Sequence, residues 1–169
     1  MNAVDLIVED DAWSSLQGKT RLVDEAISAV CEELPVREPG VVAILLGSDD
    51  AVAAMNAQFR GKEGPTNVLS FPASEHADNH LGDIALAHGV VAREAEDRAI
   101  DVADHLRHLV IHGFLHLQGY DHQTDDEAAT METIERRALA RLGVSDPMPT
   151  RMRVRTRNQN DRYTCVSRP

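Results

Sequence analysis

The chain has 169 residues, a formal net charge of −11, 43% hydrophobic residues and 8 histidines. This length suits a single domain, which buries about 70% of the surface that its unfolded chain would expose and needs no disulfides to fold. The sequence contains no run of about 18 apolar residues and no basic amino-terminal segment, so we expect neither membrane insertion nor secretion. Cys31 lies in an apolar helical pattern and Cys165 in a polar segment, so we expect no disulfide and a cytoplasmic location.

The charge is unevenly distributed along the chain. Residues 150–169 contain six arginines and one aspartate, a net charge of +5, which leaves −16 for the rest of the chain. An acidic body opposes indiscriminate phosphate binding over the whole surface, so any contact with nucleic acid must be local. We therefore expect a domain over residues 1–148 and a basic extension over residues 149–169. That extension is either disordered and solvated or an arm that orders on binding RNA.

The first half of the chain alternates strand and helix patterns. Residues 4–8 predict a short strand, and residues 19–34 predict an amphipathic helix. The continuous apolar run of residues 41–46 is typical of a strand covered on both faces. Either Ser48 or Asp49 can cap the helix that follows and ends before a Gly-rich loop.

The second half contains a further strand pair and three helices. Strands are predicted at residues 67–71 and 83–87, and helices at residues 90–99, 102–118 and 125–142. Between the two strands, residues 73–81 look like a polar surface loop with solvated His76 and His80. The helix of residues 102–118 combines an apolar stripe with a stripe of histidines, so we expect it to be the central helix, buried on one side and facing a site on the other.

Three histidines follow the spacing H-x-x-x-H-x-x-G-x-x-H, which is typical of a metal site. On a helix, His112 and His116 stand on one face with Cβ atoms about 5–6 Å apart and can bind one cation. Gly119 can adopt a left-handed conformation that ends the helix and returns His122 toward the same point. Three nitrogens leave a fourth position for water, as in catalytic zinc sites. A chance pair of histidines is the alternative, but it explains neither the glycine nor the third histidine.

The same spacing resembles the signature of metzincin peptidases, with one departure. Those enzymes carry a glutamate directly after the first histidine as general base, whereas this chain has Gly113. Glycine can neither accept a proton nor polarise water. A zinc peptidase is therefore the second candidate.

Four segments carry a more specific resemblance: residues 55–60 (MNAQFR), 65–72 (PTNVLSFP), 81–84 (LGDI) and 112–122 (HGFLHLQGYDH). In this order they resemble the YbeY family of bacterial metal-dependent endoribonucleases. The resemblance implies an α+β fold, in which a small mixed β-sheet packs with about five helices and the central helix carries the metal-binding histidines. It also implies one zinc-like ion on His112, His116 and His122, and cleavage of single-stranded RNA in 16S rRNA 3′-end maturation and ribosome quality control. The implied partners are the ribosome, with ribosomal proteins or assembly GTPases, and no membrane.

The resemblance also implies that Arg60 matters for the substrate. Its guanidinium could hold a phosphate bidentately while a bound metal polarises another oxygen. The alternative is that Arg60 is a solvated charge that stabilises the end of a helix. Lys62 can either form a second phosphate contact or simply lie on the loop surface. No protein general base is assigned, since a metal-bound water with a pKa near 7 or an RNA 2′-hydroxyl can each be the nucleophile.

Three neighbouring side chains have alternative roles. Asp121 can orient a ligand imidazole or bond its own backbone. His108 is expected to pack or to support the ligands, and Asp83 to be structural. A third function also stays open, a non-catalytic ribosome-assembly module whose metal only holds the last helix in place.

Overall fold

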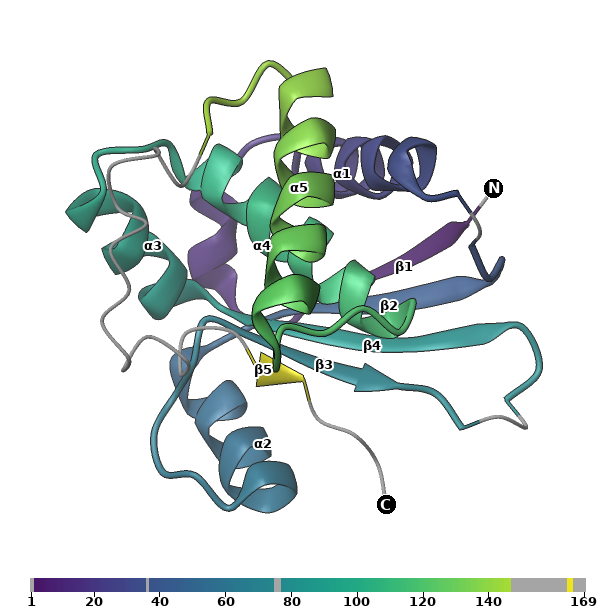
Figure 1. Ribbon diagram of the computed structural model, residues 1–169. Coiled ribbons are helices and arrows are strands. Elements are labelled where there is room, and N and C mark those ends of the chain that lie inside the picture. The colour runs from purple at the N-terminus through teal and green to yellow at the C-terminus, as the bar shows by residue number, and fades with distance from the viewer. Residues whose placement is uncertain (1, 36, 75–76, 147–163, 166–169) are drawn as a thin grey trace.

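The computed structural model describes residues 2–35, 37–74, 77–146 and 164–165, which form a mixed sheet with helices on both faces (Figure 1). The strands are β1 (Ala3–Val8), β2 (Val41–Gly47), β3 (Val68–Pro72), β4 (His80–Ala87) and β5 (Thr164–Cys165). The helices are α1 (Lys19–Glu33), α2 (Asp49–Arg60), α3 (His88–Asp97), α4 (Val102–Leu117) and α5 (Asp125–Arg141), with a short 3₁₀ turn η1 (Asp11–Ser15).

The sheet has the strand order β1-β2-β4-β3-β5. Strands β1, β2 and β4 are parallel, with Leu6 opposite Ile44 and Ile44 opposite Ile84. Strand β3 runs antiparallel to β4 through the hairpin that joins them. The predicted α+β fold with a small mixed sheet and five helices is thus confirmed.

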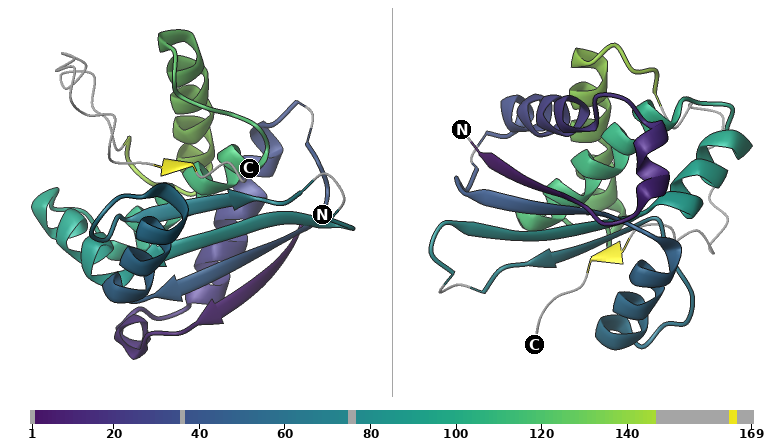
Figure 2. Two further views of the ribbon diagram at one scale, coloured as in Figure 1. Left: turned by 90° about the horizontal axis from the view of Figure 1, so that it is seen from below. Right: turned by 180° about the vertical axis from the view of Figure 1, so that it is seen from behind.

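Helices cover the two faces of the sheet unequally. Figure 2 shows α1, α4 and α5 on one face and α2 alone on the other. On the three-helix side, Val42, Ile44 and Leu46 of β2 are completely buried. The alternate residues of β2 are only half-buried, because α2 lies over β4 rather than over β1 and β2. The prediction that β2 is fully covered on both faces is therefore wrong for the α2 side.

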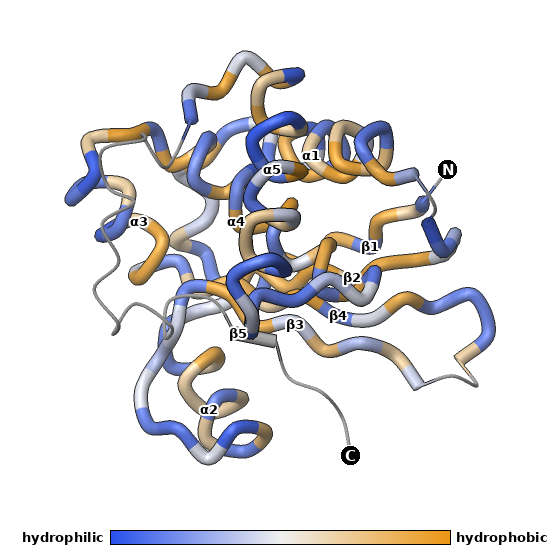
Figure 3. Tube along the Cα trace, viewed as in Figure 1, coloured by the Kyte–Doolittle hydropathy of each residue, from blue (hydrophilic) through white to orange (hydrophobic). Residues whose placement is uncertain are grey.

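Helix α4 is the centre of the core, as the sequence predicted. Twelve of its residues are buried, and it contacts α1, α3, α5, β3 and β4. Figure 3 shows the hydropathy of each residue: the strands are largely hydrophobic, and the β3–β4 hairpin has a hydrophilic tip. A Cβ atom at Gly113 would lie 3.0 Å from Ser70 Oγ and 3.1 Å from Ile84 Cγ2, so the glycine permits α4 to approach the sheet closely. The Ser70 hydroxyl donates to the Gly113 carbonyl at that point (3.2 Å).

A second close approach occurs at Gly82, where the hairpin meets the end of α4. Gly82 has φ = 141°, and a Cβ atom there would lie 2.3 Å from the Phe71 carbonyl oxygen and 2.8 Å from Leu117 Cδ2. Both the dihedral and the space exclude a side chain. The glycine thus lets the helix that carries His112 and His116 end against the sheet.

Several element boundaries differ from those predicted. Strand β4 begins at His80, inside the predicted loop of residues 73–81, because His80 pairs with Val41 of β2; the pairing with β3 begins at Gly82. His80 contacts Asp83 (3.0 Å) rather than being only solvated, and His76 lies outside the described residues. The turn η1 was not predicted; its Trp13 is completely buried and donates from Nε1 to the Gly47 carbonyl (3.0 Å).

The basic extension is described only at two residues. Thr164–Cys165 form β5, which pairs in parallel with Leu69 and Ser70 of β3. The prediction of a basic extension stays a prediction, because the rest of it, residues 149–163 and 166–169, lies outside the described part of the chain. No helix within the described residues is long and apolar enough to cross a membrane.

Candidate metal centre

The three histidines of the predicted motif converge in the structure. One ring nitrogen from each of His112, His116 and His122 lies within 4.8 Å of the others. The Nε2 atoms of His112 and His116 are 3.0 Å apart. Two nitrogens bound to one zinc ion at 2.0–2.1 Å in a tetrahedral arrangement lie about 3.3 Å apart. The observed spacing therefore suits two ligands of one ion.

The chain returns to this point through a glycine turn at the end of α4. Gly119 has φ = 87°, a left-handed conformation, and its amide donates to the His116 carbonyl (3.1 Å). The Tyr120 amide then donates to the Leu115 carbonyl (3.0 Å), which closes the helix and directs the chain back over it. His122 thereby reaches the two helical histidines, as the spacing predicted.

Hydrogen bonds on the far nitrogens orient two of the imidazoles. His112 Nδ1 lies 2.5 Å from Glu135 Oε1, and His116 Nδ1 lies 3.0 Å from the Tyr120 carbonyl oxygen. Both acceptors require a proton on Nδ1, which leaves the Nε2 lone pair of each ring directed at the shared point. His122 Nε2 is buried and has no hydrogen-bond partner. Three unprotonated nitrogens around one point fit a divalent cation.

Burial keeps the helical pair neutral, the form that binds metals. Burial, together with the neighbouring His112 and His122 rings, lowers the pKa of His116 to about 3. It also lowers the pKa of His112, against an opposing effect of Glu135. Burial on its own would raise the pKa of Glu135, but the imidazoles of His112 and His108 hold it below its usual range.

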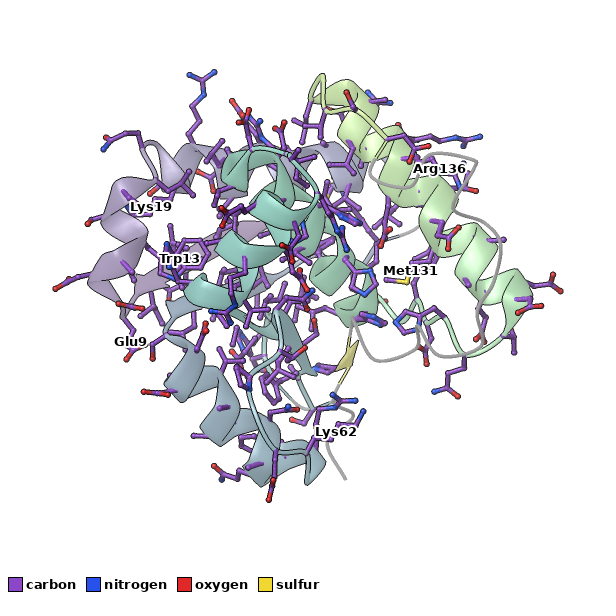
Figure 4. The ribbon with its side chains drawn as sticks, turned by 90° about the vertical axis from the view of Figure 1, so that its left-hand side faces the viewer. Glu9, Trp13, Lys19, Lys62, Met131 and Arg136 are labelled. Carbon is purple, nitrogen blue, oxygen red and sulfur yellow. The ribbon has the colours of Figure 1, made fainter. Side chains whose placement is uncertain are left out.

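Sequence reasoning missed Glu135, which lies on α5 and is only 4% exposed. Its Oε2 atom lies 3.3 Å from His108 Nε2, so His108 takes the supporting position expected for it. Figure 4 shows Met131, four residues earlier on α5, turned toward the interior. A signal existed in the sequence, because Glu135 falls on the apolar stripe of the last helix together with Met131, Ile134 and Ala138.

Asp121 and Gly113 have local roles. Asp121 Oδ1 accepts from the His122 backbone amide (2.8 Å) and Oδ2 from Gln123 Nε2 (2.9 Å), which is the backbone-bonding alternative rather than the ligand-orienting one. At the position where a metzincin carries its base, a side chain on Gly113 would meet Ser70 and Ile84 of the sheet. A glutamate at position 113 would therefore crowd the sheet.

Arg60 lies in a separate cleft, on the side of the sheet that carries α2. It is the last residue of α2, and its Nη1 atom contacts Asn56 Oδ1 at 3.5 Å, a weak interaction. Asn56 in turn donates from Nδ2 to the Gly64 carbonyl (2.8 Å), which fixes the loop after the helix. The cleft has a volume of about 390 Å³, and Figure 4 shows Lys62 on its loop. Its lining residues are Asn56, Arg60, Lys62, Glu63, Pro65 and Thr66.

A mixed sheet that supports a helix-turn site of three convergent imidazoles is the arrangement of an α+β metallohydrolase. The chain belongs to the YbeY family, because the family model described as endoribonuclease YbeY matches residues 8–143. The predicted resemblance and the endoribonuclease class are thereby confirmed, and the peptidase alternative loses its support.

Relatives and a solved structure agree with this family. An endoribonuclease YbeY of Maricaulis maris (strain MCS10) is 83% identical over 149 residues, which cover 88% of this chain and 93% of the relative. An endoribonuclease YbeY of Rhodopseudomonas palustris (strain ATCC BAA-98 / CGA009) is 43% identical over 157 residues, which cover 89% of this chain and 83% of the relative. A solution structure of a Thermotoga maritima protein has a TM-score of 0.54 at 26% identity and covers 86% of this chain and 99% of its own.

Proposed function

We propose that this protein is a zinc-dependent endoribonuclease that cuts single-stranded RNA in 16S rRNA 3′-end maturation and ribosome quality control. The observation that carries this proposal is the convergence of three imidazole nitrogens, with the Nε2 atoms of His112 and His116 3.0 Å apart. Family membership supports the reaction class. Zinc is the ion that three histidines and an open fourth position favour, although nickel and other transition metals also accept imidazole ligands.

His112, His116 and His122 would hold the ion. Bound there, a divalent cation supplies Lewis-acid polarisation of a phosphoryl oxygen and activation of the nucleophile. Among the described residues, the carboxylates of Glu135 and Asp121 are not assigned as the general base, because both oxygens of Glu135 face imidazole nitrogens and both oxygens of Asp121 accept local hydrogen bonds. Attack by water and attack by an RNA 2′-hydroxyl therefore both stay compatible with the site.

Arg60 would hold a substrate phosphate in the cleft at the end of α2. A guanidinium can bind two phosphate oxygens at once, and the cleft of about 390 Å³ has room for a phosphodiester. The acidic body restricts RNA binding to such local basic positions. Lys62 lines the same cleft and is a candidate for a second phosphate contact.

The test of this function compares two substrates. Purified protein is incubated with single-stranded RNA and with casein, each with and without a chelator. We expect cleavage of RNA alone, lost with chelator and restored by zinc. Cleavage of casein would support the zinc-peptidase hypothesis instead. Metal-dependent RNA binding without cleavage would favour a non-catalytic ribosome-assembly module.

We also propose that residues 1–148 form the catalytic domain and that residues 149–169 form a basic extension, which is either solvated or an arm that contacts RNA. Deletion of residues 150–169 removes a charge of +5 and, if the extension is such an arm, should weaken RNA binding and flatten its salt dependence, because fewer counterions are released. The truncated protein should still bind metal and cut RNA at saturating concentration. The measurement is RNA affinity across a salt series, and equal slopes for both proteins would show that the arm does not contact RNA.

The proposed substrate implies the remaining partners. Precursor 16S rRNA is folded with ribosomal proteins, so the enzyme would meet the ribosome, and ribosomal proteins or assembly GTPases, in the cytoplasm. Cosedimentation with ribosomal particles, compared between wild-type and truncated protein, measures this association.

A further inference from the structure

We propose that Glu135 is a positioning residue of the metal centre: its carboxylate fixes the tautomer of His112 and makes His112 a stronger metal ligand than His116. The inference depends on the proposed metal centre, but it concerns two side chains of this chain and is tested without RNA. It also gives helix α5 a direct part in the site, although all three ligands lie on α4 and the turn after it.

The geometry places one carboxylate between two imidazoles. Oε1 of Glu135 lies 2.5 Å from His112 Nδ1, and Oε2 lies 3.3 Å from His108 Nε2. The two histidines are four residues apart on α4, so both rings lie on the face of that helix that packs against α5. All three residues are at most 4% exposed. A buried carboxylate with both oxygens engaged cannot rotate freely, so it holds the His112 ring in one orientation.

The two ligands on α4 are supported differently. His112 faces a carboxylate, whereas His116 faces the Tyr120 carbonyl. A carboxylate on the far nitrogen raises the basicity of a ligand imidazole more than a neutral carbonyl does. His112 should therefore donate more strongly to the cation than His116 does. The negative charge of Glu135 also offsets part of the charge of a divalent ion in this buried place.

The same contact ties metal binding to the packing of α5. His112 can present Nε2 to a cation only while Nδ1 carries the proton that Glu135 accepts. A metal on Nε2 excludes the other tautomer and thereby strengthens the contact with Glu135. Zinc should therefore stabilise the wild-type protein more than a variant that lacks the carboxylate.

The experiment measures zinc affinity by competition with a chromogenic chelator for wild type, Glu135→Gln, Glu135→Ala and the control Glu132→Gln. Glutamine keeps the size and one acceptor oxygen but loses the charge, so we expect affinity to fall about 10-fold, and about 100-fold for alanine. Glu132 lies on the same helix with a side chain that is 36% exposed, and its variant should bind zinc as wild type does. Equal zinc affinity in all four proteins would overturn the inference.

A second measurement separates positioning from general loss of structure. Histidine-selective ¹⁵N NMR of the metal-free proteins should show the His112 proton on Nδ1 in wild type and in Glu132→Gln, and a shift toward the Nε2 tautomer in Glu135→Gln. An unchanged tautomer would contradict the proposal. If Glu135→Ala does not fold, the glutamine variant decides both measurements. Failure of the proposed function would look different: wild-type protein would bind zinc and show the Nδ1 tautomer, yet cut no RNA.

Discussion

Replacement of His116 by alanine is expected to remove the metal and to reduce RNA cleavage by more than about 100-fold. Loss of a single supporting contact to a ligand typically costs 10–100-fold in affinity or activity, and loss of a ligand costs more. His116 also forms the closest pair in the site, with its Nε2 atom 3.0 Å from that of His112. Metal content per chain and RNA cleavage rate are the two measurements, and wild-type protein should carry about one divalent ion per chain.

The control for this prediction is His80→Ala. His80 lies on β4, pairs with Asp83 and is not one of the three convergent histidines. Its variant should keep both metal and activity. Full metal occupancy in a protein with alanine at His112, His116 and His122 together would show that the ion binds elsewhere.

Charge reversal at Arg60 is expected to reduce RNA cleavage by roughly 10- to 100-fold while metal content stays at the wild-type level. One phosphate contact with a charged group corresponds to about 1.5–3 kcal/mol, and a glutamate adds repulsion of the phosphate. The ligands are untouched, because Arg60 lines a cleft whose described lining contains none of the three histidines. The loss should appear mainly as weaker RNA binding, measured as KM against kcat across RNA concentrations.

Arg21→Glu is a matched charge reversal on the first turn of α1, away from this cleft. The Arg21 side chain is 84% exposed, and its pairing with Glu25 is a surface contact of small energetic value. This variant should cleave RNA at close to the wild-type rate, with a slightly lower melting temperature. Wild-type turnover in Arg60→Glu would mean that Arg60 only stabilises the end of α2.

The long helices were predictable because each has a helical spacing of apolar residues and capping residues at its ends. The predicted helices of residues 102–118 and 125–142 correspond to α4 and α5 within one residue at each end. For α5, Thr124 and Glu127 form a capping box, a local interaction that depends on residues three apart. Three of the predicted site residues also come from one local motif, since His112, His116 and His122 are joined by a single helix end and one turn.

The boundaries of some helices and strands depend on contacts with residues far away in the sequence, and these boundaries were not predictable from local patterns. Helix α3 begins two residues before its predicted start, because Asp49 of α2 accepts from the Val90 amide at its first turn (3.1 Å). Strand β4 extends back to His80 because Val41 of β2 pairs with it there. Strand β5 was not predicted, and it forms where Thr164 and Cys165 pair with Leu69 and Ser70 of β3.

The sequence alone determined the metal ligands that we propose, because a helix and a glycine turn bring residues four and ten apart to one point whatever surrounds them. Only the tertiary structure decided what supports those ligands. Glu135 is 23 residues from His112, and its position depends on how α5 packs against α4. The packing of α4 against β3 and β4 turns Gly113 toward the sheet, where a peptidase base would be crowded. Contacts across the chain depend on packing, which local periodicity does not encode.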